Sequence, residues 1–242
     1  MSTQRSESDG ESDAIKSCIR IRPLNDSELE SGSRIAWEVK GDSISSIPND
    51  IRDIVHEFSY DKLISSEETN EDVYVKTTRE IVTAAVDGFN GTIFAYGQTS
   101  SGKTHTIRGS YETPGLLPLA VGELFDILEK TPNRQFLVRA CYLEIYNEEI
   151  KDLLEPSALP LKLRETVDNN FEVVGVHEQV VVSSDEVFML MEDGDGHRSV
   201  GSTKMNQRSS RSHSLFRITI ESSEASTRHR PQCGGLSCGL SV

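Results

Sequence analysis

The sequence predicts an α/β fold, in which amphipathic helices alternate with apolar strands. Residues 69–86 place apolar side chains at three- and four-residue steps, as one face of a helix requires. Residues 91–96 form a strand-like apolar run that leads directly into a loop framed by glycines. A second helical pattern follows at 116–130, and a long strand is expected at 136–146. Strands that alternate with helices along the chain are typical of the α/β class.

The other expected elements are shorter and are separated by turn-forming residues. Strand-like runs lie at 14–21, 35–39 and 43–47, bounded by Gly, Asn, Asp or Pro. A short helix is expected at 185–192, with the Asp-Gly-Asp-Gly run that follows as its stop signal. The last strand is expected at 215–220.

Both ends of the chain lack the pattern of a folded segment. Residues 1–13 are dominated by Ser, Asp, Glu and Gly, so they are expected to be disordered. Residues 222–242 carry no periodicity and are expected to form an unstructured tail. The folded part is therefore expected to span residues 14–221.

Composition and charge exclude several classes of protein. The 242 residues are 36% hydrophobic and 26% charged, which is an ordinary balance for a globular protein. No apolar run approaches the roughly 20 residues that cross a bilayer, so no membrane span is expected. The net charge of −14 disfavours nucleic-acid binding. The N-terminus has neither signal-peptide nor transit-peptide features, so the expected compartment is the cytosol or nucleus.

The four cysteines predict no metal site. Cys18 and Cys141 lie in apolar, strand-like segments and are expected to be buried. Cys233 and Cys238 are separated by four residues, and no second Cys or His pair follows at the spacing of metal ligands. A zinc site is therefore not expected.

The loop after the strand at 91–96 carries a pattern for phosphate binding. It matches G-x-x-x-x-G-K-[ST] without a mismatch, with an apolar strand before it and a helix start after it. The glycines let successive N–H groups converge on a phosphate, and the following helix adds the positive end of its dipole. Lys103 would reach the β- and γ-phosphates, and the Thr104 hydroxyl would ligate Mg²⁺. An ordinary Gly/Ser turn would not explain Lys-Thr directly after the second glycine. The residues of the loop are Gly97, Gln98, Thr99, Ser100, Ser101, Gly102, Lys103 and Thr104.

Three further blocks of sequence accompany this loop. Residues 20–23 read Arg-Ile-Arg-Pro, residues 142–154 contain Leu-Glu-Ile-Tyr-Asn-Glu, and residues 206–213 read Asn-Gln-Arg-Ser-Ser-Arg-Ser-His. Together with GTIFAYGQTSSGKTHT at 91–106, and in this order, they resemble the kinesin motor domain, most nearly its CENP-E-like kinesin-7 branch. The resemblance implies a P-loop NTPase fold with a mixed central sheet and helices on both faces. It also implies an ATPase that uses ATP and Mg²⁺, binds microtubules and associates with the cytoskeleton in the cytoplasm.

The resemblance assigns an adenine-binding role to residues outside the phosphate loop. Arg20, Arg22 and Pro23 resemble the turn that contacts the adenine, and His105 would lie on its other side. Taken without the resemblance, the two arginines would be interpreted as solvated charges beside a strand.

The block at 206–213 resembles the family's switch I motif. Ser210 resembles the serine linked to Mg²⁺, while Ser209 and Asn206 resemble the residues near the γ-phosphate and the attacking water. Arg211 resembles the arginine that pairs with a glutamate of switch II. The alternative for 209–214 is a polar loop before a strand.

The resemblance does not extend to the switch II motif, D-L-A-G-S-E. After His213 the acidic residues are Glu221 and Glu224, so no D-x-x-G follows. The chain is therefore expected to be about the first two-thirds of a motor domain. In the family's strand order the missing strands flank the strand at 92–96, so both edges of that strand are expected to lack a partner. Unpaired strand edges favour aggregation.

Two other functions stay open beside a kinesin-type motor ATPase. One is a non-motile nucleotide-binding fragment from a truncated or alternative transcript, because the family's main microtubule-binding elements follow switch II. The other is a generic P-loop kinase, against which the blocks at 142–154 and 206–213 argue.

Overall fold

The computed structural model describes residues 15–41, 43–49, 53–157, 159–167, 171–200, 212–224 and 232–240, with backbone alone at 199–200 and 232–240. The chain divides into two compact units, Met1–Glu67 and Glu68–Val242. The expected disorder at 1–13 lies outside the described residues. In the described part, no helix is long and apolar enough to span a membrane.

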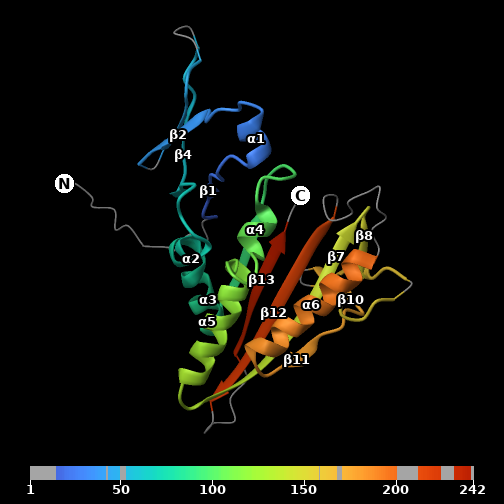
Figure 1. Cartoon of the computed structure of the whole chain (residues 1–242). Helices are drawn as coiled ribbons and strands as arrows, with labels where there is room; N and C mark the ends of the chain where they lie inside the picture. The colour runs from blue at the N-terminus through green and yellow to red at the C-terminus, as the bar shows by residue number, and fades with distance from the viewer. Residues whose placement is uncertain are drawn as a thin grey trace, which may run out of the picture. The chain divides into compact units, whose positions relative to one another are not determined.

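In its described residues, the first unit holds two small sheets and one short helix (Figure 1). Its elements are β1 (Cys18–Arg20), α1 (Asp26–Glu30), β2 (Trp37–Lys40), β3 (Ser43–Ser46), β4 (Glu57–Ser59) and β5 (Lys62–Ile64). Strands β1 and β5 are parallel, and β2, β3 and β4 form an antiparallel sheet. The three expected strand-like runs correspond to β1, β2 and β3. Cys18, which was expected to be buried, is exposed at the start of β1.

The second unit is built on a mixed sheet with the strand order β11-β7-β12-β13-β6, and β8 pairs with β7. Its strands are β6 (Asn90–Ala95), β7 (Arg134–Tyr146), β8 (Glu149–Asp152), β11 (Gln179–Val181), β12 (His213–Glu224) and β13 (Gln232–Leu240). A separate hairpin joins β9 (Lys162–Glu165) to β10 (Phe171–Val174). Along β12 buried and more exposed residues alternate, as expected for a strand whose one face is covered.

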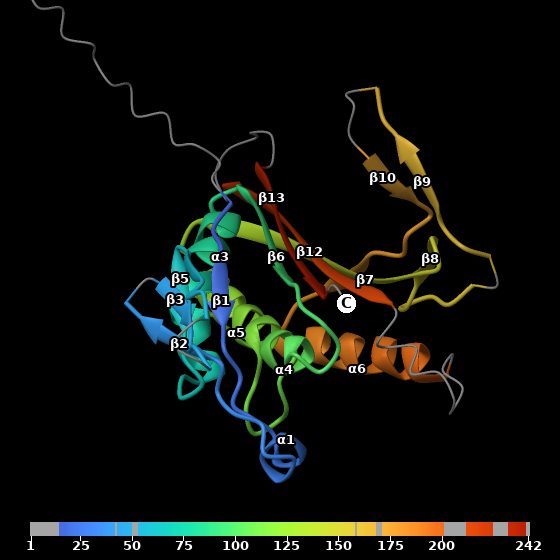
Figure 2. The same cartoon turned by 90° about the horizontal axis from the view of Figure 1, so that it is seen from above.

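Helices of the second unit pack on this sheet. They are α2 (Asn70–Val73), the π-helical turn η1 (Tyr74–Thr78), α3 (Arg79–Val86), α4 (Lys103–Ile107), α5 (Leu116–Lys130) and α6 (Ser184–Val200). Helices α5 and α6 lie side by side along one face of the sheet (Figure 2). Val82 of α3, Leu124 of α5, Val187 of α6 and Ile218 of β12 are almost completely buried and form the core. The helix expected at 116–130 has the same bounds as α5.

The helix expected at 69–86 is present but is not uniform. It begins after Thr69, whose hydroxyl accepts from the backbone N–H of Asp72 while the Asp72 carboxylate accepts from the Thr69 backbone N–H. This reciprocal cap satisfies two N–H groups at the helix start. A π-helical turn at Tyr74–Thr78 then separates α2 from α3, and Tyr74 and Thr78 are both buried.

Helix α6 is longer than the sequence pattern predicts. The Asp-Gly-Asp-Gly run at 193–196 was expected to end the helix near residue 192, but α6 continues to Val200. Gly194 packs against the Tyr142 ring and Asp195 forms an ion pair with Arg108. These tertiary contacts offset the low helix propensity of glycine, about 1 kcal/mol per residue relative to alanine.

The C-terminal part of the chain differs from the unstructured tail expected at 222–242. Strand β12 runs to Glu224, and residues 232–240 form β13, antiparallel to β12 and parallel to β6 (Figure 2). The strand at 92–96 therefore has a partner on one edge, where two open edges were expected. On its other edge, no strand of the described residues pairs with β6. The glycine-rich β13 has no alternating pattern. Its register is defined by its backbone pairing with β12 on one side and β6 on the other.

Candidate nucleotide-binding site

The phosphate-binding pattern lies on the strand, loop and helix that its chemistry requires. Strand β6 ends at Ala95, the loop follows, and α4 begins at Lys103. Gly102 has φ +98°, a left-handed conformation that glycine adopts without steric cost. At Gly97 the constraint is space, because a Cβ there would lie 2.6 Å from Ser101 Oγ and 3.3 Å from Ser101 Cβ. The two glycines therefore permit the tight curl of the loop.

Lys103 folds back over this loop. Its ammonium Nζ donates to the carbonyl oxygens of Gly97 at 2.6 Å and Gln98 at 2.8 Å. Thr104 and His105, the next two residues of α4, are exposed. Among the side chains that the structure describes, none caps the first turn of α4. A lysine ammonium, an exposed hydroxyl and an uncapped helix start form a donor set that suits a magnesium-bound polyphosphate.

Asn70 anchors α4 from outside the loop. It is 5% exposed, and its Nδ2 donates to the carbonyl oxygens of His105 at 3.1 Å and Thr113 at 3.3 Å. One amide thus ties the first turn of α4 to the loop before α5. Sequence reasoning missed Asn70, because a polar residue at a helix start is ordinarily solvated, and its burial is decided by the packing of α2 against α5.

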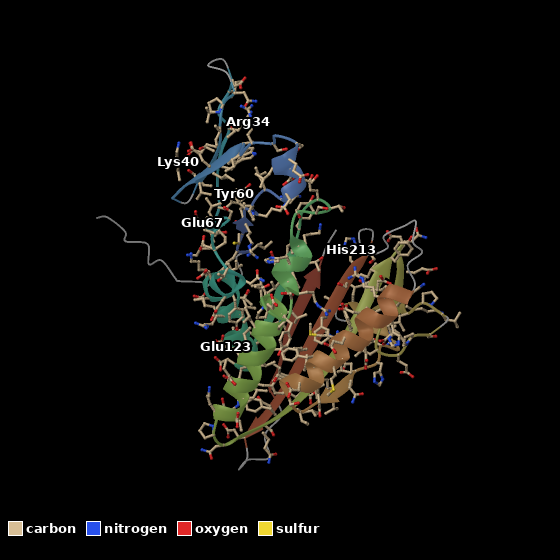
Figure 3. The ribbon with its side chains drawn as sticks, viewed as in Figure 1. Arg34, Lys40, Tyr60, Glu67, Glu123 and His213 are labelled. Carbon is tan, nitrogen blue, oxygen red and sulfur yellow. The ribbon has the colours of Figure 1, made fainter. Side chains whose placement is uncertain are left out.

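The sheet brings two sequence blocks together at one end of its strands, which is called this edge of the sheet below. Ala95, at the end of β6, pairs with Leu240 of β13, and Leu240 pairs with Ser214 of β12. The start of β12, marked by His213 in Figure 3, therefore lies at the same edge of the sheet as the start of the phosphate loop. Residues 97–104 and the end of the block at 206–213 are brought together by strand pairing alone.

A buried charge pair lies beside this edge. The Glu144 carboxylate on β7 is almost completely buried, and its Oε1 is 3.4 Å from Arg198 Nε on α6. The Arg198 guanidinium also donates to the hydroxyl oxygen of Ser212 at 2.9 Å and to its carbonyl oxygen at 3.3 Å. Because a buried charge without its partner is costly, this arrangement holds the end of α6 near the start of β12.

Comparison with known proteins identifies the family. The family model of the kinesin motor domain matches residues 20–238, which is most of the chain. The chain belongs to the kinesin family. The family match extends through most of β13, beyond residue 221, where the resemblance was expected to end.

Relatives among curated proteins include plant kinesin-like proteins of the KIN-7 group, so the expected kinesin-7 resemblance is confirmed. "Kinesin-like protein KIN-7D, mitochondrial" of Arabidopsis thaliana is 43% identical over 88% of this chain. "Kinesin-like protein KIN-7D, chloroplastic" of Oryza sativa subsp. japonica is 44% identical over 85%. "Kinesin-like protein KIN-7O" of Arabidopsis thaliana is 45% identical over 84% of this chain and 16% of its own length. The chain spans about a fifth of the length of the first two relatives.

A solved kinesin confirms the expected kinesin-type fold. The structure described as "Structure of a fast kinesin: Implications for ATPase mechanism and interactions with microtubules" aligns with a TM-score of 0.84 at 34% identity. The alignment covers 94% of this chain and 64% of the fast kinesin.

The turn at 20–23, for which an adenine-binding role is predicted, belongs to the first unit, whereas residues 97–104 belong to the second. Binding of one nucleotide by both therefore stays a prediction. Within the first unit, the Arg22 guanidinium donates to both carboxylate oxygens of Glu28, at 2.7 and 2.6 Å, and to the Pro23 carbonyl at 2.9 Å. Hydrogen bonds from Arg22, followed by one from the Asn25 backbone, lower the pKa of Glu28 to about 2. Arg20 ends β1 beside this turn. The Arg22 guanidinium is thus oriented by the Glu28 carboxylate.

The residues predicted to form switch I, Asn206, Ser209, Ser210 and Arg211, lie outside the described residues. Their predicted roles toward Mg²⁺, the γ-phosphate and switch II therefore stay predictions. Of the block at 206–213, only Ser212 and His213 are described, and Ser212 is bound by Arg198.

Proposed function

We propose that the chain binds Mg·ATP through residues 97–104, as the nucleotide-binding part of a kinesin-type microtubule motor ATPase. The observation that carries this proposal is the position of Lys103. It begins α4 directly after the left-handed Gly102, and its ammonium lies within 2.8 Å of two carbonyls of the same loop. A cation at the start of a helix whose first turn has no side-chain cap favours an anionic ligand.

Each residue of the proposed site has a separate task. Lys103 contacts the β- and γ-phosphates, and Thr104 supplies a hydroxyl to Mg²⁺ together with Ser210. The metal, when bound, neutralises charge on the phosphate oxygens. In this proposal Asn206 and Ser209 would act toward the γ-phosphate and the attacking water. The adenine is contacted by a group made up of Arg20, Arg22, Pro23 and His105.

Titration with a fluorescent ATP analogue tests the phosphate loop. Lys103→Ala should weaken binding by about tenfold or more, because a charge-assisted contact to phosphate is lost. Lys130→Ala is the matched control, since Lys130 lies at the exposed end of α5 and pairs with Asp126. Equal affinity of the wild type and Lys103→Ala would contradict the proposal.

The metal contacts are tested by comparing ATP binding with and without Mg²⁺. Thr104→Ala and Ser210→Ala should each weaken Mg·ATP binding and leave the binding of metal-free ATP almost unchanged. An equal loss in both conditions would assign these hydroxyls to the fold and not to the metal.

A second candidate is nucleotide binding without motility. Residues 225–242 contain no Asp or Glu, so the D-x-x-G of the family's switch II is absent there. The net charge of −14 also opposes contact with the acidic microtubule surface. For this polypeptide we expect neither co-sedimentation with microtubules nor microtubule-stimulated ATP hydrolysis. Stimulation by microtubules would instead support a working motor.

Association with the microtubule cytoskeleton in the cytoplasm is part of the motor proposal. The names of two relatives place those proteins in mitochondria and chloroplasts. Co-localisation of a fluorescently tagged chain with microtubules, mitochondria or plastids distinguishes the compartments.

A further inference from the structure

A three-residue cluster joins the phosphate-loop helix to α6 and β7. Asp195 of α6 forms an ion pair with the Arg108 guanidinium, and its Oδ1 accepts a hydrogen bond of 2.7 Å from the Tyr142 hydroxyl. Arg108 also donates to that hydroxyl at 3.4 Å. One carboxylate therefore connects Arg108, which directly follows α4, to a central strand and a long helix.

Packing holds the cluster in a defined geometry. Tyr142 is 3% exposed, and burial, followed by the charge of Asp195 and its hydrogen bond, raises the pKa of Tyr142 to about 12. Its hydroxyl therefore stays protonated and donates to Asp195 at neutral pH. Gly194, the neighbour of Asp195, lies against the Tyr142 ring, so α6 cannot rotate or withdraw without breaking this contact.

The cluster is connected to both parts of the proposed nucleotide site. The backbone N–H of Arg108 donates to the carbonyl of Thr104 at 2.8 Å. The ion pair between Arg108 and Asp195 is therefore connected, through one backbone hydrogen bond, to the last residue of the phosphate loop. Arg198 lies three residues after Asp195, on the same side of the helix, and binds Ser212 at the start of β12. A displacement of α6 would thus act together on the phosphate loop and on Ser212, near the end of the 206–213 block.

We propose that Asp195 is a positioning residue for nucleotide binding, whose pairing with Arg108 and Tyr142 sets the placement of α4 and the affinity of the phosphate loop. This rests on the proposed function. Asp195 acts through Arg108 and has no contact with the nucleotide in the proposal. The aspartate belongs to the Asp-Gly-Asp-Gly run, which from the sequence was interpreted as a helix stop.

The experiment measures, for each variant, the dissociation constant of a fluorescent ATP analogue with Mg²⁺ and the midpoint of thermal unfolding. Asp195→Asn and Arg108→Gln should each weaken binding by about three- to tenfold. The double variant should bind the ATP analogue no more weakly than either single variant does. Tyr142→Phe, which keeps the buried ring, should weaken binding less. Asp193→Asn is the matched control: it makes the same change at an exposed position of the same helix and should bind as the wild type does.

A positioning role and a merely structural role differ in these readouts. Binding should weaken at temperatures well below the unfolding midpoint, and Arg108→Lys should recover part of the affinity lost in Arg108→Gln. Unchanged affinity with a lowered unfolding midpoint would overturn the proposal, as would losses that add in the double variant. If Lys103→Ala weakens binding while Asp195→Asn does not, only the positioning role fails. If the wild type and Lys103→Ala bind equally, both proposals fail.

Discussion

Gly194 of α6 and Tyr142 of β7 pack so closely that position 194 has no room for a side chain. A Cβ built on Gly194 would lie 2.3 Å from Tyr142 Cδ1 and 2.9 Å from Cε1. The aromatic ring is itself packed edge-on against Phe216 of β12, at 5.4 Å between ring centroids, so it cannot easily move aside. The glycine therefore sets how closely α6 approaches the sheet.

Gly194→Ala should destabilise the protein although alanine is the better helix former. The intrinsic gain of about 1 kcal/mol is outweighed by overpacking, which costs about 1–3 kcal/mol or more. Gly196→Ala is the matched control, because no atom lies within 4 Å of a Cβ at that position of the same helix. Chemical denaturation should show a lower free energy of unfolding for the first variant and an equal or higher one for the second. An equal or higher free energy of unfolding for Gly194→Ala would show that the close approach is not a constraint.

Gly102→Ala should strain the phosphate loop through the backbone alone. Its φ of +98° is unfavourable for any residue with a Cβ, while nothing lies within 4 Å of the added methyl group. We expect a loss of stability of about 1–2 kcal/mol and weaker binding of the ATP analogue. Gly122→Ala, in the helical α5 and also without a neighbour within 4 Å, should be neutral or stabilising. Unchanged stability and affinity of Gly102→Ala would mean that the loop relaxes to another conformation.

Asn70→Ala should loosen the first turn of α4. The substitution leaves the carbonyls of His105 and Thr113 without the amide donor and should cost about 1–3 kcal/mol. Asn70→Asp keeps the shape but replaces the donor with an acceptor, so it should be no more stable than the alanine variant. Amide hydrogen exchange should be faster at Thr106 and Arg108, whose N–H groups bond within α4. A fully stable aspartate variant would contradict the role of the donor.

Acidification should release the Arg22 side chain from Glu28. The pKa of Glu28 is lowered to about 2, so the pair contributes stability above the ordinary glutamate value of about 4.3 and loses it as the pH falls toward 2. In an NMR titration of the Glu28 carboxyl, Arg22→Gln should move its pKa back toward the ordinary range. A Glu28 pKa unaffected by the substitution would show that Arg22 does not hold the carboxylate in solution.

The elements that sequence patterns predicted well are those with a continuous local signal. Helix α5 has an apolar face at helical spacing, and β6 with its glycine-framed loop is identified by consecutive residues. The strands of the hairpin β9–β10 and the short β8 and β11 were not expected, because three or four residues carry too little pattern. Helix α1 was also missed, although Asn25 and Glu28 form a capping box that could have indicated it.

What the sequence by itself determined is the set of groups proposed to bind phosphate, because the glycines, the lysine and the threonine all lie within eight consecutive residues. Only the tertiary structure decided the length of α6, the place of β13 and the cluster at Asp195. Arg108 and Tyr142 are 34 residues apart, and Tyr142 and Asp195 are 53 apart, so no local pattern relates them. For β13, backbone hydrogen bonds to β12 and β6 supply what a glycine-rich sequence cannot specify. The groups of the phosphate loop are neighbours in the sequence, so a local pattern identifies them. The contacts of α6, β13 and Asp195 form only when folding brings distant segments together.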